Sequence, residues 1–138
     1  MTMLRSIVFA AVAAAMVVPA ASQVMVRVPA PDVKVGLEGP EFDACGGFGK
    51  IVAAPGAEKE VAVYNHTQWR NRIDRIAVGT QVWMCETRDG WQGIVYPAGP
   101  DQSPGDCGVS SPIAAPKTYR GPCKSGWISP TSVELLAG

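Results

Sequence analysis

Four cysteines are the residues of this chain whose type and spacing indicate defined chemistry. Cys45, Cys85, Cys107 and Cys123 are separated by 40, 22 and 16 residues, so they contain no CxxC pair. The chain has a single histidine, His66, and a zinc site would need closely spaced Cys and His ligands. We therefore expect no metal site and two disulfides, because the number of cysteines is even. Of the three possible pairings, the one favoured joins Cys45 to Cys85 and Cys107 to Cys123.

His66 is the first candidate for catalysis, but its neighbours do not support that role. It lies in a polar stretch between Asn65 and Thr67, with no recognisable Ser, Asp or reduced Cys partner. The carboxylates do not form a pair that the sequence places across a cleft, as hydrolysis of a glycoside would require. These carboxylates are Glu58, Glu60, Asp74, Glu86 and Asp89. We therefore expect a protein that is not an enzyme, with no catalytic residue and no cofactor.

Arginines cluster in the middle of the chain. Arg70, Arg72 and Arg75 lie close together, and Arg88 follows them. Guanidinium groups can bind a carboxylate or a phosphate, but a solvated face is the favoured interpretation. The whole chain balances 12 Lys and Arg against 12 Asp and Glu. Since binding to a phosphate backbone needs an excess of positive charge, nucleic acid is not an expected partner.

The N-terminus has the pattern of a cleaved signal peptide over residues 1–22. Arg5 provides a positive charge, residues 7–18 form a 12-residue uncharged apolar run, and small residues within 19–22 suit signal peptidase. An apolar helix of that length reaches about 18 Å, which is less than the roughly 30 Å of a bilayer core. We therefore expect a periplasmic or secreted protein with no stable membrane span after cleavage. Disulfides form in such a compartment.

Residues 23–44 are expected to form an N-terminal arm or an edge strand. Apolar and polar residues alternate in parts of this segment, but Pro29, Pro31 and Pro40 interrupt it. From Gly49 onward, short apolar runs rich in β-branched and aromatic residues alternate with turn residues, which is typical of an all-β sandwich or barrel. The expected strands are 50–53, 61–64, 76–78, 81–85, 91–96, 126–128 and 133–136.

Two local patterns refine this all-β prediction. Asp89-Gly90 lies between two of the expected strands and predicts a hairpin, because this dipeptide suits the two positive φ values of a type I′ turn. In the strand 81–85, Val82 and Met84 face one side while Trp83 and Cys85 face the other. Because both faces are apolar, we expect this strand to be central and covered on each side.

Several runs of residues carry a resemblance to a known family. They are Asp74-Arg75-Ile76, Val78-Gly79-Thr80-Gln81-Val82, Asp89-Gly90-Trp91-Gln92-Gly93-Ile94-Val95 and Ser125-Gly126-Trp127-Ile128-Ser129. Together with the segment Cys-Gly-Val-Ser-Ser-Pro at 107–112, they resemble an exported single-domain subgroup of the bacterial SH3-like (SH3b) domain family. Two features depart from the family pattern. Residues 64–69 replace its usual Arg-Ser-Gly-Pro turn, and residues 97–122 insert a loop rich in Pro and Gly.

The resemblance implies a fold for residues 45–138. This SH3b-like domain should be a small, partly open barrel of about five strands, with a long insertion loop tied by a disulfide. A short 3₁₀ turn around residues 130–132 should precede its last strand.

The resemblance also implies a function, which is binding of a cell-wall (peptidoglycan) peptide or a protein ligand. The aromatic residues that it assigns to the ligand surface are Trp69, Trp91, Tyr119 and Trp127. For Trp91 and Trp127, packing in the core is the favoured interpretation and ligand contact the alternative. A second hypothesis is a structural or regulatory envelope protein, an assembly partner or inhibitor, that contacts its partner through the insertion loop.

Overall fold

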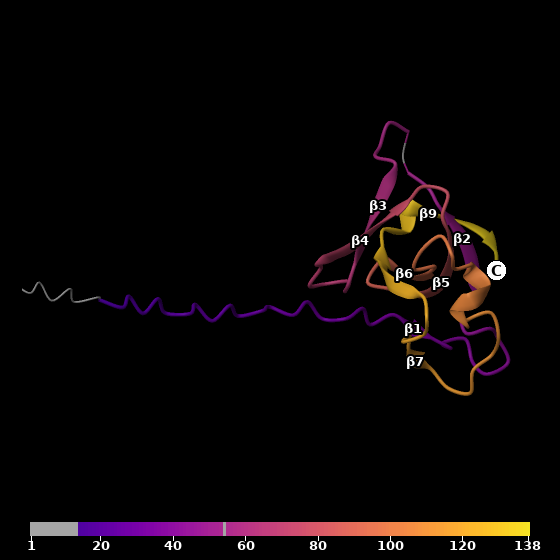
Figure 1. Cartoon of the computed structure of the whole chain (residues 1–138). Helices are drawn as coiled ribbons and strands as arrows, with labels where there is room; N and C mark the ends of the chain where they lie inside the picture. The colour runs from indigo at the N-terminus through magenta and orange to yellow at the C-terminus, as the bar shows by residue number, and fades with distance from the viewer. Residues whose placement is uncertain (1–13, 54) are drawn as a thin grey trace, which may run out of the picture.

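The computed structural model describes residues 14–53 and 55–138, and this part of the chain is all-β, as the sequence predicts. Strands and two short 3₁₀ helices follow one another along it (Figure 1). They are β1 (Lys34–Val35), β2 (Gly47–Ile51), β3 (Glu60–Tyr64), β4 (Arg72–Ala77), β5 (Gln81–Arg88), β6 (Trp91–Tyr96), η1 (Pro104–Cys107), β7 (Lys117–Thr118), β8 (Lys124–Ile128), η2 (Pro130–Ser132) and β9 (Val133–Ala137).

The strands form two antiparallel sheets. A 7-stranded sheet has the order β4-β3-β8-β6-β5-β2-β9, and β1 pairs with β7 in a 2-stranded sheet. Strands β5 and β6 form a tight hairpin in which Arg88 pairs with Trp91. The turn residues Asp89 and Gly90 have φ values of 52° and 76°, and both are positive as a type I′ turn requires. The predicted hairpin is therefore confirmed.

The large sheet is not a closed barrel. Strand β2 lies between β5 and β9, so the last strand of the chain pairs with the first strand of this sheet. The edge strands β4 and β9 do not pair with each other within the described residues. Every predicted strand range overlaps a strand of the large sheet. Neither β7 nor η1 is predicted, because elements this short carry no hydrophobic period.

The hydrophobic core consists of two clusters, and the central strands contribute to both. Val82 of β5 and Ile94 of β6 belong to one cluster, whereas Val95 belongs to the other, against which Trp83 and Cys85 pack. The two apolar faces predicted for β5 are therefore both covered. The sheet cluster contains Ile51, Val63, Ile76, Val82, Ile94, Tyr96 and Ile128. The disulfide cluster contains Val35, Ala44, Cys45, Val95, Cys107, Val109, Tyr119 and Cys123.

The two disulfides lie in the disulfide cluster and have the favoured pairing. Cys45 is joined to Cys85, and Cys107 is joined to Cys123. The first bond ties the start of the domain to β5, and the second closes the insertion loop across 16 residues. A loop of that length removes about 3 kcal/mol of chain entropy from the unfolded state, which helps a small domain.

The predicted domain boundary at residue 45 is too late. Val33, Val35 and Ala44 are buried, although they belong to the segment predicted as an arm. Strand β1 of this segment pairs with β7 of the insertion loop. The arm therefore becomes part of the domain from about residue 33, because its apolar side chains fill the disulfide cluster.

Residues 14–28 are exposed, have no regular secondary structure and run away from the domain (Figure 1). The predicted signal peptide falls mainly on residues 1–13, which lie outside the described residues. In residues 14–53 and 55–138, no helix has the length and apolar character needed to span a bilayer.

Gly126 lets the β3–β4 hairpin approach β8. A methyl group at this position would collide with the side chain of Val63 and lie 3.0 Å from the carbonyl oxygen of Tyr64. Tyr64 pairs with Trp127 at this crossing. The loop that joins β3 to β4 is thereby brought beside the β5–β6 turn.

Candidate functional site

The loop 65–71, between β3 and β4, is built around a buried amide. The backbone N–H of Asn65 donates to the carbonyl of Asn71 at 3.1 Å, and the Asn71 N–H donates back to the Asn65 side-chain oxygen at 2.9 Å. The amide nitrogen of Asn65 donates to the carbonyl of Pro29 at 3.1 Å. The buried side chain of Asn65 therefore closes the loop and also contacts the N-terminal segment. The loop that stands where the SH3b pattern has its Arg-Ser-Gly-Pro turn is thus ordered.

A second buried polar group holds the loop against the β5–β6 turn. The Thr67 hydroxyl donates to a carboxylate oxygen of Asp89 at 3.0 Å. Asp89 is the turn residue with positive φ, so the hydrogen bond joins two features that lie 22 residues apart in sequence.

Trp69 is exposed at the tip of this loop. Its side chain is 73% exposed, and one face of the indole stacks on the His66 ring, with centroids 4.7 Å apart and 25° between the planes. The Nδ1 atom of His66 accepts a hydrogen bond from the backbone N–H of Gln68 at 3.0 Å, which orients the imidazole. The contact with His66 fixes the indole while most of its surface remains open to solvent.

Trp91 lies at the start of β6 and is half-buried. The guanidinium carbon of Arg70 lies 4.5 Å from the centroid of the Trp91 ring system, a cation–π contact. Tyr64 approaches Trp91 edge-on, with centroids 5.7 Å apart and 73° between the planes. We call the group formed by Tyr64, His66, Trp69, Arg70 and Trp91 the aromatic surface.

Beneath the aromatic surface lies a network centred on Asp32. Trp127 Nε1–H donates to Asp32 Oδ1 at 3.0 Å, and Arg88 donates to Oδ2 at 2.7 Å. His66 Nε2 lies 3.5 Å from Oδ2. Arg88 also holds Glu86 through two hydrogen bonds of 2.8 and 2.9 Å, and its guanidinium lies 4.6 Å above the Trp127 ring.

The charges of this network stabilise one another. Burial alone would raise the pKa of Asp32, but hydrogen bonds from Arg88 and Trp127 outweigh it and hold this pKa below its usual value. Burial would lower the pKa of Arg88, but the carboxylates of Asp32 and Glu86 raise it. Asp32 and Arg88 therefore stay ionised at neutral pH and form an ion pair.

The four aromatic residues expected on a ligand surface do not all lie there. Trp69 and Trp91 both belong to the aromatic surface. Trp127 is 0% exposed, because it packs beneath Arg88 and Asp32. Tyr119 is buried in the disulfide cluster, where its hydroxyl donates to the Cys107 carbonyl at 2.8 Å. The side chains of Tyr119 and Trp127 are therefore buried in this conformation and do not belong to the aromatic surface.

The basic run is divided among different partners. Arg75 forms an exposed ion pair with Glu58 at 2.7 Å, Arg88 belongs to the Asp32 network, and Arg70 covers Trp91. Arg72 forms no ion pair with any other residue of the described chain. The run is therefore not one patch.

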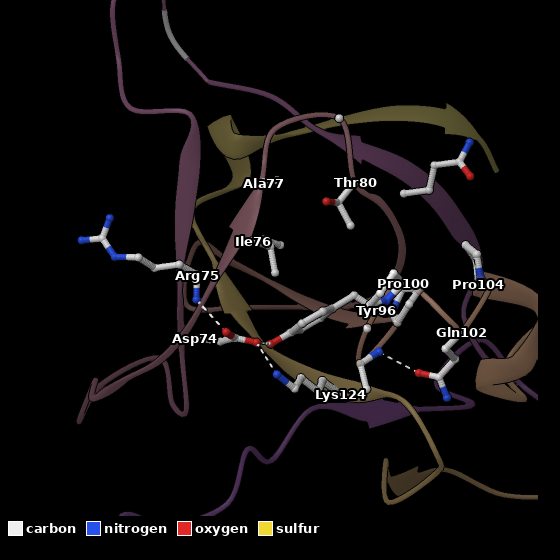
Figure 2. A pocket seen from close by; sticks show the side chains of 15 residues that line it. Asp74, Arg75, Ile76, Ala77, Thr80, Tyr96, Pro100, Gln102, Pro104 and Lys124 are labelled. Carbon is white, nitrogen blue, oxygen red and sulfur yellow. Dashed lines mark hydrogen bonds and ion pairs between the residues drawn. The ribbon is translucent and has the colours of Figure 1, made fainter.

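Apart from the aromatic surface, a cavity of about 610 Å³ lies beside residues 74–77 of β4 (Figure 2). Asp74 points into it and accepts hydrogen bonds from the Tyr96 hydroxyl and from Lys124 Nζ, each at 3.0 Å. Burial tends to raise the pKa of Asp74, but the hydrogen bonds of Lys124 and Arg75 lower it overall. Burial beside Asp74 raises the pKa of Tyr96. Since Asp74 ties β4 to β6 and β8, we interpret this cluster as a structural brace.

Sequence reasoning missed Asp32 and the network that surrounds it. Asp32 lies in a Pro-rich segment that carries no local motif, and its partners Arg88 and Trp127 are 56 and 95 residues away. Spacing along the chain gives no signal for such a contact.

No group of three or more His, Cys, Asp or Glu side chains that could hold a metal ion occurs in residues 14–53 and 55–138. No protein-family model, curated protein or solved structure matches this chain. Any function must therefore be argued from the geometry of the aromatic surface and its surroundings.

Proposed function

We propose that this chain is an exported, non-catalytic SH3-like binding module for a cell-wall peptide or a protein ligand. The observation that carries the proposal is the exposed indole of Trp69, held by His66 and adjacent in sequence to Arg70, which stacks on Trp91. An exposed, fixed aromatic side chain next to an oriented cation is typical of a recognition surface.

The strand order supports an SH3-like fold. Five adjacent strands, β9-β2-β5-β6-β8, follow the chain except that the last strand returns to the first. The 3₁₀ helix η2 stands immediately before β9, as the SH3b resemblance implies. The β3–β4 hairpin then extends from β8 and places the loop 65–71 beside the β5–β6 turn.

The chemistry of the aromatic surface favours an extended peptide with a carboxylate group. The Trp69 ring offers an apolar face for an aliphatic or proline side chain. Stacking on Trp91 orients the Arg70 guanidinium, whose N–H groups can then pair with a carboxylate. The nearby Asp32 and Glu86 are already paired with Arg88, so they compete less for Arg70.

Export is supported by the cysteines. Two disulfides are characteristic of proteins in oxidising compartments, and the predicted signal peptide would deliver the chain there. We therefore place the module in the periplasm or outside the cell.

A pull-down with purified peptidoglycan tests this function. The oxidised, exported chain should bind saturably, and Trp69→Ala should remove most of that binding. Phe42→Ala is the matched control, because Phe42 is also exposed, at 58%, but lies outside the aromatic surface. Wild-type protein that fails to bind the wall or any envelope protein would refute the proposal. Recovery of one envelope protein that tolerates Trp69→Ala would favour contact through the insertion loop instead.

A further inference from the structure

Residues 29–33, which we call the strap, lie across the domain in an irregular conformation. Besides the carbonyl oxygen of Asp32, which Arg88 reaches, three of the strap's carbonyl oxygens accept hydrogen bonds from distant parts of the domain. These bonds run from Asn65 Nδ2 to Pro29 at 3.1 Å, from Arg120 Nη1 to Pro31 at 2.7 Å, and from the Tyr119 backbone N–H to Val33 at 2.8 Å. The domain thus supplies donors along almost the whole strap.

The side chain of Asp32 is bound by two donors of the domain, Arg88 and Trp127. Its two carboxylate oxygens accept from Trp127 Nε1–H at 3.0 Å and from Arg88 Nη1 at 2.7 Å, and Arg88 Nη2 also reaches the Asp32 carbonyl at 3.3 Å. These are charge-assisted hydrogen bonds in a half-buried place, which are stronger than neutral ones. These two donors therefore favour an acidic residue at this position of the strap.

The strap is held in the way that a bound peptide is held. Pro29 and Pro31 have no backbone N–H, so at these positions the strap presents acceptors and no donors. Proline also restricts the free chain to extended conformations, which lowers the entropy lost on binding. Donors of the domain face Pro29, Pro31 and Asp32 of the Pro-x-Pro-Asp pattern.

One side of the strap is open. A cavity of about 380 Å³ lies beside it, lined by Ala30 and Pro31 of the strap and by Ile73, Tyr96 and Lys124 of the domain, among others. On the N-terminal side of the strap, residues 14–28 are exposed. Residues 29–32 can therefore leave the domain without moving Val33, whose side chain is buried.

We infer that the seat of the strap, formed by Asn65, Arg88, Arg120 and Trp127, is a binding site for extended Pro-x-Pro-acidic peptides of a partner protein. The strap is its intramolecular occupant and competes with the partner segment. The seat adjoins the aromatic surface, since His66 Nε2 lies 3.5 Å from Asp32 Oδ2, but it includes none of the residues of that surface, so the inference does not depend on the function proposed above. Because the strap is tethered, its effective concentration is in the millimolar range and masks the site.

Fluorescence anisotropy with the labelled peptide Val-Pro-Ala-Pro-Asp-Val tests the inference. The exported chain is compared with a variant that carries Pro29→Ser, Pro31→Ser and Asp32→Ser. The peptide should bind the variant at least ten-fold more tightly than the wild-type chain. A peptide with Asn in place of Asp should bind the variant about ten-fold more weakly, since it loses the charge-assisted bonds. Equal affinity for the two proteins, or for the two peptides, would overturn the inference.

Two controls keep the test decisive. Adding Trp69→Ala to the strap variant should leave peptide affinity unchanged, which separates this site from the aromatic surface. If the strap variant does not fold, the peptide is titrated into wild-type protein with ¹⁵N-labelled tryptophan. The indole N–H signal absent from Trp127→Phe should then shift at millimolar peptide, and an unmoved signal would count against the site. A dimer formed only by chains with an intact strap would assign the seat to a second copy and overturn the partner proposed here.

Discussion

Trp127 lies within β8, and Trp91 begins the neighbouring strand β6. We nevertheless expect their replacement by alanine to lower the free energy of unfolding by very different amounts. Trp127 is fully buried, and removing a buried Trp side chain costs about 3 to 5 kcal/mol. The loss of its Nε1–H donor to Asp32 adds about 1 kcal/mol. Trp91 is only half-buried, and its contacts with Arg70 and Tyr64 together contribute about 1 to 2.5 kcal/mol.

Urea denaturation followed by far-ultraviolet circular dichroism measures both costs, because this signal does not depend on tryptophan fluorescence. Unfolding free energies should fall by at least about 1.5 kcal/mol more for Trp127→Ala than for Trp91→Ala, with similar m values. If Trp127→Ala is too unstable to fold, Trp127→Phe replaces it and should still lose more than Trp91→Phe. Equal losses for the two positions would refute the assignment of Trp127 to the core and Trp91 to the surface.

Three further predictions concern the disulfides, the brace and the strand crossing. Replacing Cys107 and Cys123 by Ser should lower the unfolding free energy by about 3 kcal/mol in the same assay, and oxidised, denatured wild-type protein should contain no free thiol by Ellman titration. Because the pKa of Asp74 is lowered in the folded state, its contribution is present above the usual Asp pKa and is lost as the pH falls through the folded-state value. Stability curves between pH 6 and pH 2, at about unit intervals, should therefore be flatter for Asp74→Asn, and an unchanged slope would contradict the brace. Gly126→Ala should cost about 1 to 3 kcal/mol in thermal unfolding, since the added methyl meets Val63, whereas Gly99→Ala, which meets no neighbour, should be close to neutral.

The parts of the fold that depend on local sequence could be predicted. Asp89-Gly90 specifies its turn through backbone preference alone. The apolar residues on both faces of 81–85 predict that both faces of β5 are covered, and the two core clusters cover them. The all-β class was also accessible, since short apolar runs separated by turns are typical of a sandwich or barrel. The burial of the arm was not accessible, because Val35 packs in the disulfide cluster with residues of the insertion loop that are far away in sequence.

The candidate site was predictable only in part. Trp69 and Trp91 could be proposed because the SH3b resemblance implies an aromatic ligand surface, which aromatic residues of this small domain can supply. Whether an indole faces solvent depends on what covers it, and Trp127 is covered by Asp32 and Arg88 from other parts of the chain. The seat of the strap could not be predicted for the same reason, because its residues come from four separate segments of the chain.

Both covalent cross-links lie in the disulfide cluster, whereas the sheet cluster contains no cysteine. Amide hydrogens of the strands around Ile94 and Ile128 should therefore remain protected from exchange with deuterium when the protein is reduced. Amides of the insertion loop and of Tyr119, which donates to the strap, should exchange first. Oxidation would then act as a late step of maturation. The sheet can assemble while the thiols are still reduced, and the layer that holds the strap is fixed only after they have been oxidised.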